Sequence, residues 1–279
     1  MELKQVIGLR RSIRFWQPWR PVESEKLQAI VAAVHRAPRV LEIDFIRTIV
    51  LRIDELSDEE RASMKTPTTS AQIELCPVLL WIFADLDAID SAGENLRELI
   101  RVGALHSSHG FSEERLASTI VPEVYGALKN HKPQVPIAPP APQGPPPVKY
   151  SREVLQLARS AIGIAQTYAM LAAVDAGLGT QLSWVTPAAP RKIMKLPSSW
   201  LGTNPVFIGY AAESREAGGQ RPREPLEDDF FEGRHGRPFR SDPAVVARLE
   251  RAGMISAPLP TAERFAELQR LARMFGLPE

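Results

Sequence analysis

The sequence predicts a protein that mixes helices and strands, and three observations support this. The chain has 279 residues, enough for one large core or two small ones. Hydrophobic residues make up 44% and charged residues 24%, as in an ordinary soluble globular protein. Some segments carry apolar residues at helical spacing, whereas others are short apolar runs with the length of strands.

Two helices are predicted near the N-terminus. Residues 1–9 place apolar side chains on one side of a short helix. An amphipathic helix follows Pro21, with acidic residues in its first turn that suit the helix dipole. Pro38 ends this helix, because proline has no amide hydrogen to donate.

Three strands are predicted from apolar runs. Phe45–Ile53 alternates and is rich in β-branched residues, which favours a strand. Val78–Ala84 and Pro205–Ala212 are nearly continuous apolar runs, as is typical of strands buried on both faces. A further helix is predicted over Asn95–Leu105.

The longest predicted helix covers Ser151–Gly179. Ser151 is the expected N-cap, and Gly177 and Gly179 are expected to end the helix. The segment is apolar on nearly all sides, which indicates a central position in the domain. Its uncharged run, 160–174, is shorter than the roughly 20 residues that cross a bilayer, so no membrane span is predicted.

A proline-rich segment precedes this helix. Eight of the 15 residues from Pro133 to Pro147 are proline, so no regular helix or strand is expected to run through it. We interpret residues of about 103–150 as an insertion. It is either a surface excursion, a lid or wall over a site, or a ligand for an SH3-type domain.

The C-terminal part is predicted to form an extended arm and two helices. The arm follows Gly219 and is polar and rich in turn residues. We expect residues 1–240 to form the main domain and 241–279 a helical extension. The expected apolar contacts of that extension are Leu249, Phe265, Leu268, Leu271 and Phe275.

Composition and motifs exclude several classes of function. A net charge of +1 argues against a nucleic-acid-binding protein. Cys76 is the only cysteine, so neither an intramolecular disulfide nor a CxxC site is expected. His106 and His109 form the only close histidine pair. A solvated loop or helix end is favoured over a metal pair there, and no metal site is predicted.

The sequence contains no familiar catalytic or nucleotide-binding motif. The phosphate-binding loop, the dinucleotide fingerprint and the nucleophile elbow are all missing from the sequence. The N-terminus lacks the apolar core of a signal peptide, so the cytoplasm is the expected compartment.

The stretch Arg10–Trp16, RRSIRFW, gathers cations after the first helix. Arg10, Arg11 and Arg14, with the hydroxyl of Ser12, suit a phosphate monoester, whereas a solvated surface cluster is the alternative. Three charge-assisted hydrogen bonds of about 1.5–3 kcal/mol each give about 5–9 kcal/mol. Since micromolar binding takes about 8 kcal/mol, a tightly held ligand also needs an apolar or aromatic body.

The order of several motifs resembles the nitroreductase superfamily of FMN-dependent NAD(P)H oxidoreductases. They are RRSIR, the RAP that ends the second helix, the helix AQTYAMLAAVDAGLGT and the late RPREPLED. The resemblance covers roughly residues 3–101 and 150–238. It implies an α+β sandwich with a mostly antiparallel sheet between helices. It also implies a homodimer with exchanged elements and two FMN sites at its interface.

The resemblance also implies which residues hold FMN. Arg10, Ser12 and Arg14 would bind its phosphate and ribityl oxygens, with Arg11 adjacent, and Arg221 and Arg223 would close on the same phosphate. The other implied flavin contacts are Pro38, Arg39 and Val40 from the second subunit, the backbone of Leu182, Ser183 and Trp184, and Gln72.

The implied reaction passes hydride from NAD(P)H through flavin N5 to a nitro, quinone or similar conjugated acceptor in a ping-pong mechanism. Two alternatives are a flavin oxidase or dehydrogenase of a specialised metabolite, and a degenerate flavin-fold protein that only binds.

The segment after RAP departs from the family pattern. Glu42, Asp44 and Phe45 replace residues that the family uses near the flavin. Carboxylates beside the ring would disfavour an anionic reduced flavin, unless they pair with Arg39 and Arg47. Glu42, Phe45 and Trp184 are the expected substrate-pocket residues, and Trp184 stacks there or belongs to the core.

Overall fold

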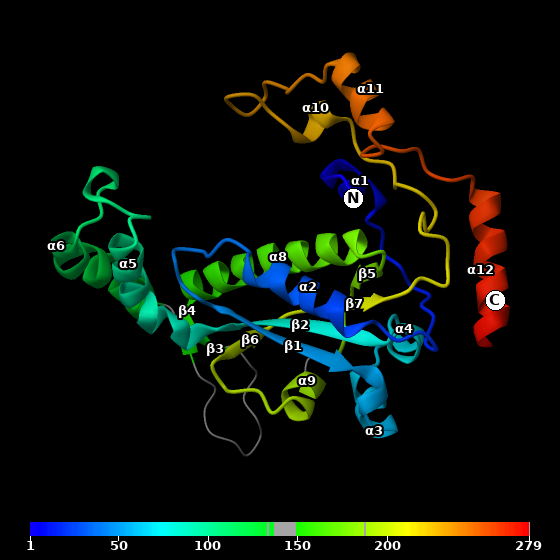
Figure 1. Ribbon diagram of the computed structural model, residues 1–279, viewed down its shortest axis with the longest axis horizontal. Coiled ribbons are helices and arrows are strands. Elements are labelled where there is room, and N and C mark those ends of the chain that lie inside the picture. Colours follow the sequence, from blue (N-terminus) through cyan, green and yellow to red (C-terminus); the bar gives the residue numbers. More distant parts are fainter. Residues whose placement is uncertain (133, 137–148, 187, 279) are drawn as a thin grey trace.

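A computed structural model describes residues 1–132, 134–136, 149–186 and 188–278. The described residues form a five-stranded sheet in the order β1-β2-β7-β5, with β6 pairing to β2 beside β7 (Figure 1). All of these strand pairs are antiparallel, as the resemblance implied. The strands are β1 (Ile46–Arg52), β2 (Val78–Asp85), β5 (Gly179–Leu182), β6 (Trp200–Gly202) and β7 (Val206–Gly209).

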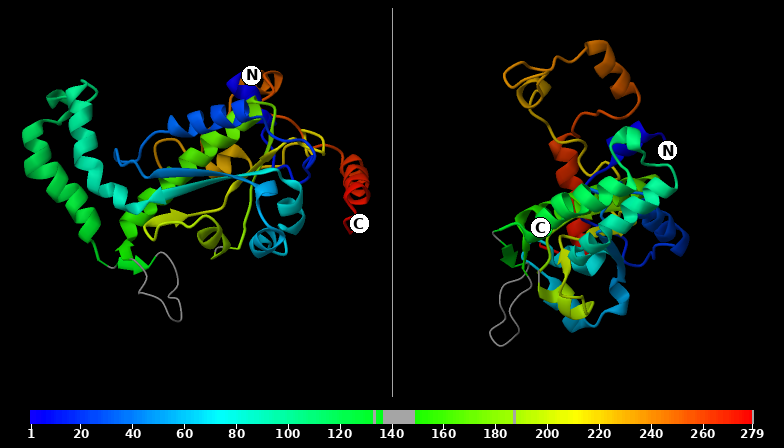
Figure 2. Two further views of the ribbon diagram at one scale, coloured as in Figure 1. Left: turned by 60° about the horizontal axis from the view of Figure 1, so that its bottom comes forward. Right: turned by 90° about the vertical axis from the view of Figure 1, so that its left-hand side faces the viewer.

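Strand β2 separates two cores, as expected of a strand buried on both faces. Its residues 78, 80, 82 and 84 belong to the core under α2 (Ser24–His35) and α8 (Arg152–Asp175). Residues 79, 81 and 83 belong to the core on the other face, beside α3 (Asp58–Met64), α4 (Ser70–Leu75) and α9 (Ala188–Ile193). The result is the predicted sandwich of a sheet between two layers of helices (Figure 1; Figure 2).

Helix α8 is the central helix that its sequence predicted. The Ser151 hydroxyl accepts a hydrogen bond from the Val154 amide at 3.3 Å and caps the first turn. Beyond the last turn, Gly177 adopts a φ of +83°, which glycine tolerates best. Of the described helices, only α8 is long and apolar enough to cross a membrane. It packs on α2 and β2, so it is a core helix here.

The arginine-rich stretch runs as an extended segment after α1 (Leu3–Leu9). Ser12 bridges Thr180 of β5 in parallel, and the Ile13 amide donates to the Thr180 carbonyl at 3.0 Å. A Cβ at Gly179 would lie 2.7 Å from Ile13 Cγ1, so glycine permits this close approach. The edge of the sheet thereby fixes the backbone of the arginine cluster.

A helical projection extends from one end of the sheet (Figure 2). The predicted helix Asn95–Leu105 is α5, which spans Ala92–Arg101 and ends before Gly103 at φ +76°. The rest of the projection contains a 3₁₀ turn at Ser107–His109, α6 (Glu113–Arg115), a π-helical stretch (Leu116–Tyr125) and α7 (Gly126–Asn130).

The insertion ends in a short pair of strands, β3 (Gln134–Pro136) and β4 (Lys149–Ser151). The prolines between β3 and β4 lie outside the described residues, as does Pro133. The lid, excursion and SH3-ligand interpretations of this segment therefore stay predictions.

The arm and two helices predicted near the C-terminus are present. The arm is exposed and contains α10 (Leu226–Asp229), and it leads to α11 (Pro243–Arg251) and α12 (Thr261–Phe275). Leu271 is fully buried, as expected, and Leu249, Leu268 and Phe275 are half-buried. The expectation for Phe265 was wrong. It is 61% exposed, because α12 turns Leu271 and Ala272 inward and leaves Phe265 on the outer side.

Candidate cofactor site

Four arginines that are distant in sequence lie close together beside β5. They are Arg10, Arg14, Arg221 and Arg223. Burial lowers the pKa of Arg10, and the positive charges of Arg11 and Arg223 lower it further. Burial likewise lowers the pKa of Arg14, together with the charge of Arg221. In each of these pairs, one arginine comes from residues 10–14 and the other from residues 221–223. The two charges therefore lie within electrostatic reach, although about 210 residues separate them along the chain.

Three of these guanidinium groups lack an acidic partner. Within the part of the chain that the structure describes, the side chains of Arg10, Arg221 and Arg223 contact no acceptor. Like charges held together without a counter-charge repel one another, and an anion removes that repulsion. The cluster has the geometry and charge of a site for a phosphate group.

Arg11 has a different role from its neighbours. Its side chain is only 8% exposed, and Nη1 donates to the Gly8 carbonyl at 2.6 Å. It also reaches the carbonyl of Glu216 at 3.2 Å and pairs with that residue's carboxylate. Arg11 therefore anchors the turn at Glu216 to the end of α1.

Ser12 and Arg14 lie on the same extended segment as Arg10. Ser12 is half-buried at its bridge to Thr180, and its carbonyl accepts from Arg14 Nη1 at 3.0 Å. The backbone amides of Arg14 and Phe15 both donate to the carboxylate of Glu213. The sequence analysis missed Glu213, since nothing in YAAES reveals a partner about 200 residues away.

The segment after β5 exposes the residues expected beside the flavin ring. Leu182 and Trp184 are 44% and 56% exposed, and Ser183 is half-buried. Trp184 lines an apolar cavity of about 740 Å³ together with Trp81 and Phe83 of β2. Trp184 is thus a surface residue at a cavity mouth, which decides against its core alternative.

Residues expected to reach a second subunit lie in an exposed turn after α2. Pro38 and Arg39 are exposed and Val40 is half-buried, with a bridge from Val40 to Ile43. Gln72 is half-buried in α4. No residue of the turn lines the cavity beside Trp184, so a single chain does not bring all the expected flavin contacts together.

Glu42 and Asp44 are the two carboxylates that depart from the family pattern. Among the described residues, only Asp44 has a cationic partner. Asp44 pairs with Arg39 at 3.8 Å, as one of the alternatives proposed. Arg47 instead forms an ion pair with Asp85. Its hydrogen bond to Asp44 is to the backbone carbonyl and not to the carboxylate. Burial raises the pKa of Tyr125, and the Glu42 charge raises it further, so that carboxylate lies near the phenol.

Glu42 itself is held by its backbone. It adopts a φ of +54°, and its carbonyl accepts from Asn95 Nδ2 at 3.0 Å. Among the described residues its carboxylate has no ion pair, so its charge is not neutralised.

Phe45 is corrected from a pocket residue to a core residue. Its side chain is fully buried in the core beneath α2 and α8. Phe45 lies just before β1, where its carbonyl accepts from the Asp85 amide at the end of β2 at 2.7 Å, and this contact holds the residue over that core. Of the three residues expected in the substrate pocket, Trp184 lines the cavity, whereas Glu42 does not.

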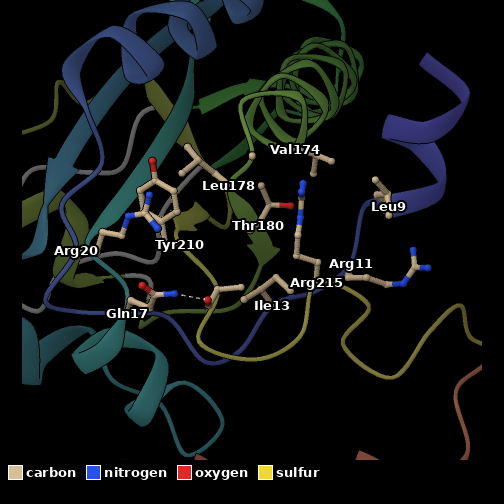
Figure 3. A pocket seen from close by; sticks show the side chains of 13 residues that line it. Leu9, Arg11, Ile13, Gln17, Arg20, Val174, Leu178, Thr180, Tyr210 and Arg215 are labelled. Carbon is tan, nitrogen blue, oxygen red and sulfur yellow. Dashed lines mark hydrogen bonds between the residues drawn. The ribbon is translucent and has the colours of Figure 1, made fainter. Parts of the chain in front are cut away.

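A second cavity, of about 260 Å³, lies on the other side of the arginine-rich stretch. Figure 3 shows Arg20 and Tyr210 on one side of it and Leu9 and Arg11 on the other. The Arg20 guanidinium lies 3.4 Å from the Tyr210 ring centroid, so it is already engaged. Side chains alternate along an extended segment, so this cavity and the cluster of Arg10, Ser12 and Arg14 face opposite ways.

The described residues offer no grouping of three or more His, Cys, Asp or Glu side chains that could hold a metal ion. His106 lies before the exposed 3₁₀ turn Ser107–His109, where its Nδ1 accepts from the Ser108 amide at 3.2 Å. This is the helix-end alternative for the histidine pair.

Comparison with known proteins relates the chain to others through structure. Neither the protein-family models nor the curated proteins contain a match. A protein described as a nitroreductase from Exiguobacterium sibiricum, solved with FMN, has a TM-score of 0.61 and 18% identity, covering 83% of this chain and 97% of that one. A protein described as an NAD(P)H:FMN oxidoreductase from Staphylococcus epidermidis has a TM-score of 0.60 and 17% identity, covering 83% and 95%.

An enone reductase of gut-bacterial fatty acid saturation, CLA-ER, has a TM-score of 0.57 and 16% identity, and the match covers 84% of this chain and 98% of that one. At such identities the likeness concerns the course of the backbone. The antiparallel sheet between helices, the arginine-rich stretch on its edge and these matched structures together show that this chain has the nitroreductase fold, as its motifs predicted.

Proposed function

We propose that the protein is an FMN-dependent oxidoreductase. One observation carries the proposal: Arg10 and Arg14 converge with Arg221 and Arg223 on the edge of a nitroreductase-type sheet. Three of these four groups have no counter-charge among the described residues, and a phosphate ester supplies one. The E. sibiricum structure, which shares the fold, contains FMN.

The residues of this chain would hold the cofactor from its phosphate to its ring. The arginines and the Ser12 hydroxyl take the phosphate end, and the backbone from Leu182 to Trp184 lies beside the ring. Trp184 and the apolar cavity next to it provide a dry surface for a conjugated acceptor. When bound, FMN would supply the site for hydride transfer at N5, so no acid–base pair is required.

We propose NAD(P)H as the electron donor and a nitro, quinone or similar conjugated compound as the acceptor, in a ping-pong mechanism. An enone reductase and an NAD(P)H:FMN oxidoreductase among the matched structures support this class of reaction. The cytoplasm is the compartment that we propose. A flavin oxidase of a specialised metabolite remains the alternative enzyme.

We also propose that the working form is a homodimer. The turn at Pro38 and Arg39 is exposed, and neither residue lines the Trp184 cavity of its own chain. A second copy would bring that turn, and Glu42 with it, to the flavin of its partner. The cofactor site would then be complete only in the dimer.

The visible spectrum of the purified protein tests the proposal. We expect a yellow protein with flavin absorption that is bleached by NADH or NADPH without oxygen. A preparation that stays colourless after incubation with FMN would refute the flavoenzyme and support a binding protein with a degenerate site. A yellow protein that neither nucleotide bleaches would favour the oxidase.

A further inference from the structure

A buried carboxylate lies directly behind the arginine cluster. The side chain of Glu213 is 0% exposed. Its Oε1 accepts from the backbone amide of Phe15 at 3.1 Å and also from that of Arg14. These bonds fix the peptide from which the Arg14 side chain projects, so the carboxylate determines where that guanidinium starts.

The cation that neutralises Glu213 comes from α12, near the end of the chain. Arg264 Nη2 donates to Glu213 Oε2 at 2.5 Å, and Nη1 donates to Glu267 at 2.6 Å. Burial acts to lower the pKa of Arg264, but the hydrogen bonds and charges of Glu213 and Glu267 outweigh it and raise that pKa. Both terminal nitrogens of the Arg264 guanidinium thus donate to carboxylates, one to Glu267 and one to Glu213.

Helix α12 and Leu259, which precedes it, also contact the segment that leads to Arg221 and Arg223. Glu267 accepts from the Ser214 amide at 2.5 Å, and the Cδ of Arg264 lies beside Gly218. The Leu259 amide donates to the Gly218 carbonyl at 3.1 Å. Arg221 follows three residues after Gly218. The contacts at Gly218 therefore hold the turn that leads to Arg221 and Arg223.

Stacking fixes the far end of α12. The ring of Phe275 stacks on Phe15 at 6.2 Å and on Trp19 at 6.1 Å between centroids. The helix is therefore attached to Glu213 by a salt bridge at one end and to Phe15 and Trp19 by aromatic contacts at the other.

We propose that Arg264 is a positioning residue for the phosphate of FMN, acting through Glu213, and this inference rests on the proposed function. Arg14 lies close enough to Glu213 for the carboxylate to raise its pKa, opposing the burial and the charges of Arg221 and Arg264 that lower it. Without Arg264, a buried carboxylate is left without a cation, which is strongly unfavourable. The guanidinium of Arg14, whose own backbone amide donates to Glu213, would turn to that carboxylate and leave the phosphate.

The test compares FMN with riboflavin, which has the same ring but no phosphate. The dissociation constants of both flavins are measured by fluorescence quenching for the wild type and for Arg264→Ala. We expect FMN affinity to fall about tenfold or more, the loss of one charge-assisted bond, while riboflavin affinity stays within about twofold. A variant at exposed Arg270, Arg270→Ala, is the control on the same helix and should change neither constant.

A double variant separates positioning from folding. In Glu213→Gln with Arg264→Ala, the amide oxygen still accepts from the backbone of Arg14 and Phe15, but no buried charge attracts the Arg14 guanidinium. This variant folds without a buried unpaired charge and should recover the wild-type preference for FMN over riboflavin.

Three results would overturn the inference: an equal loss of both flavins in Arg264→Ala, no change in either, or a double variant that still lacks the preference. If the wild type itself binds neither flavin, the proposed function fails, and this outcome is distinct because it appears before any substitution.

Discussion

At the scale of single residues, the phosphate assignment depends on two half-buried arginines, Arg10 and Arg14, that lie near the exposed Arg223 and Arg221. We expect Arg10→Ala combined with Arg14→Ala to release FMN, because two charge-assisted bonds of about 1.5–3 kcal/mol each are removed. Dialysis followed by the flavin absorbance per chain measures this. The matched control is Arg36→Ala, an exposed arginine after α2. Full flavin occupancy in the double variant would refute the assignment.

Glu42 and Asp44 give a second prediction at this scale, since one carboxylate is paired and the other is not. We expect Glu42→Gln to raise the midpoint potential of the flavin, because a negative charge disfavours an anionic reduced ring. A change on the order of 30 mV corresponds to about 1.4 kcal/mol for two electrons. Redox titration of the holoprotein measures it.

Asp44→Asn is the matched comparison, since Arg39 already neutralises that carboxylate. It should shift the potential less than Glu42→Gln. Equal shifts in the two variants would show that proximity to Arg39 does not matter.

Cys76 yields a prediction about reactivity. Burial raises the pKa of its thiol to about 12, and the side chain is 1% exposed. A raised pKa keeps the thiol protonated at every pH below about 12, and the thiolate is the reactive form. We expect no reaction with an aromatic disulfide reagent at pH 8 in the native protein. One thiol per chain should react after denaturation, and a fast reaction in the native state would contradict the burial.

At the scale of elements, local signals predicted the structure well where a single segment determines it. Ser151 caps α8 through Val154, and the apolar run of β2 is buried on both faces, as their sequences indicated. Predictions failed where the partner lies far along the chain. The spacing of α12 does not reveal whether Phe265 or Leu271 turns inward, since only the surface it docks on decides that.

The Ser151 cap gives a prediction for α8. Ser151→Ala removes the hydrogen bond to the Val154 amide and the one that the hydroxyl donates to the Leu128 carbonyl at 2.5 Å. We expect a loss of about 1–2 kcal/mol in the free energy of unfolding. Thermal unfolding should show a fall of a few degrees in Tm. Ser160→Ala, on the exposed side of the same helix, should leave Tm nearly unchanged.

At the scale of the whole molecule, the sequence predicted the two halves of the arginine cluster but not what holds them. The family motifs predicted that Arg221 and Arg223 lie with Arg10 and Arg14, and the fold determines that Arg10 lies near Arg223 and Arg14 near Arg221. Glu213 and Arg264 had no such signal, because a single Glu and a single Arg are common residues and 51 positions separate them.

Dimerisation is the prediction that belongs to the molecule as a whole. We expect sedimentation to give twice the 30.9 kDa of one chain for the FMN-bound protein. Since the turn at Pro38 would complete the partner's site, dilution into monomers should release flavin as well. A monomer that retains FMN at nanomolar concentration would contradict the shared site.

The contacts of Glu213 also bear on the order in which the protein folds. The carboxylate that orders Arg14 and Phe15 lies 199 positions after Arg14, and its cation, Arg264, lies a further 51 positions along the chain. Contacts this distant in sequence form late, because closing a long loop has an entropic cost that later contacts must offset. The sheet and core helices should therefore fold before the proposed phosphate site is finished, so the cofactor would be acquired only in the last stage of folding.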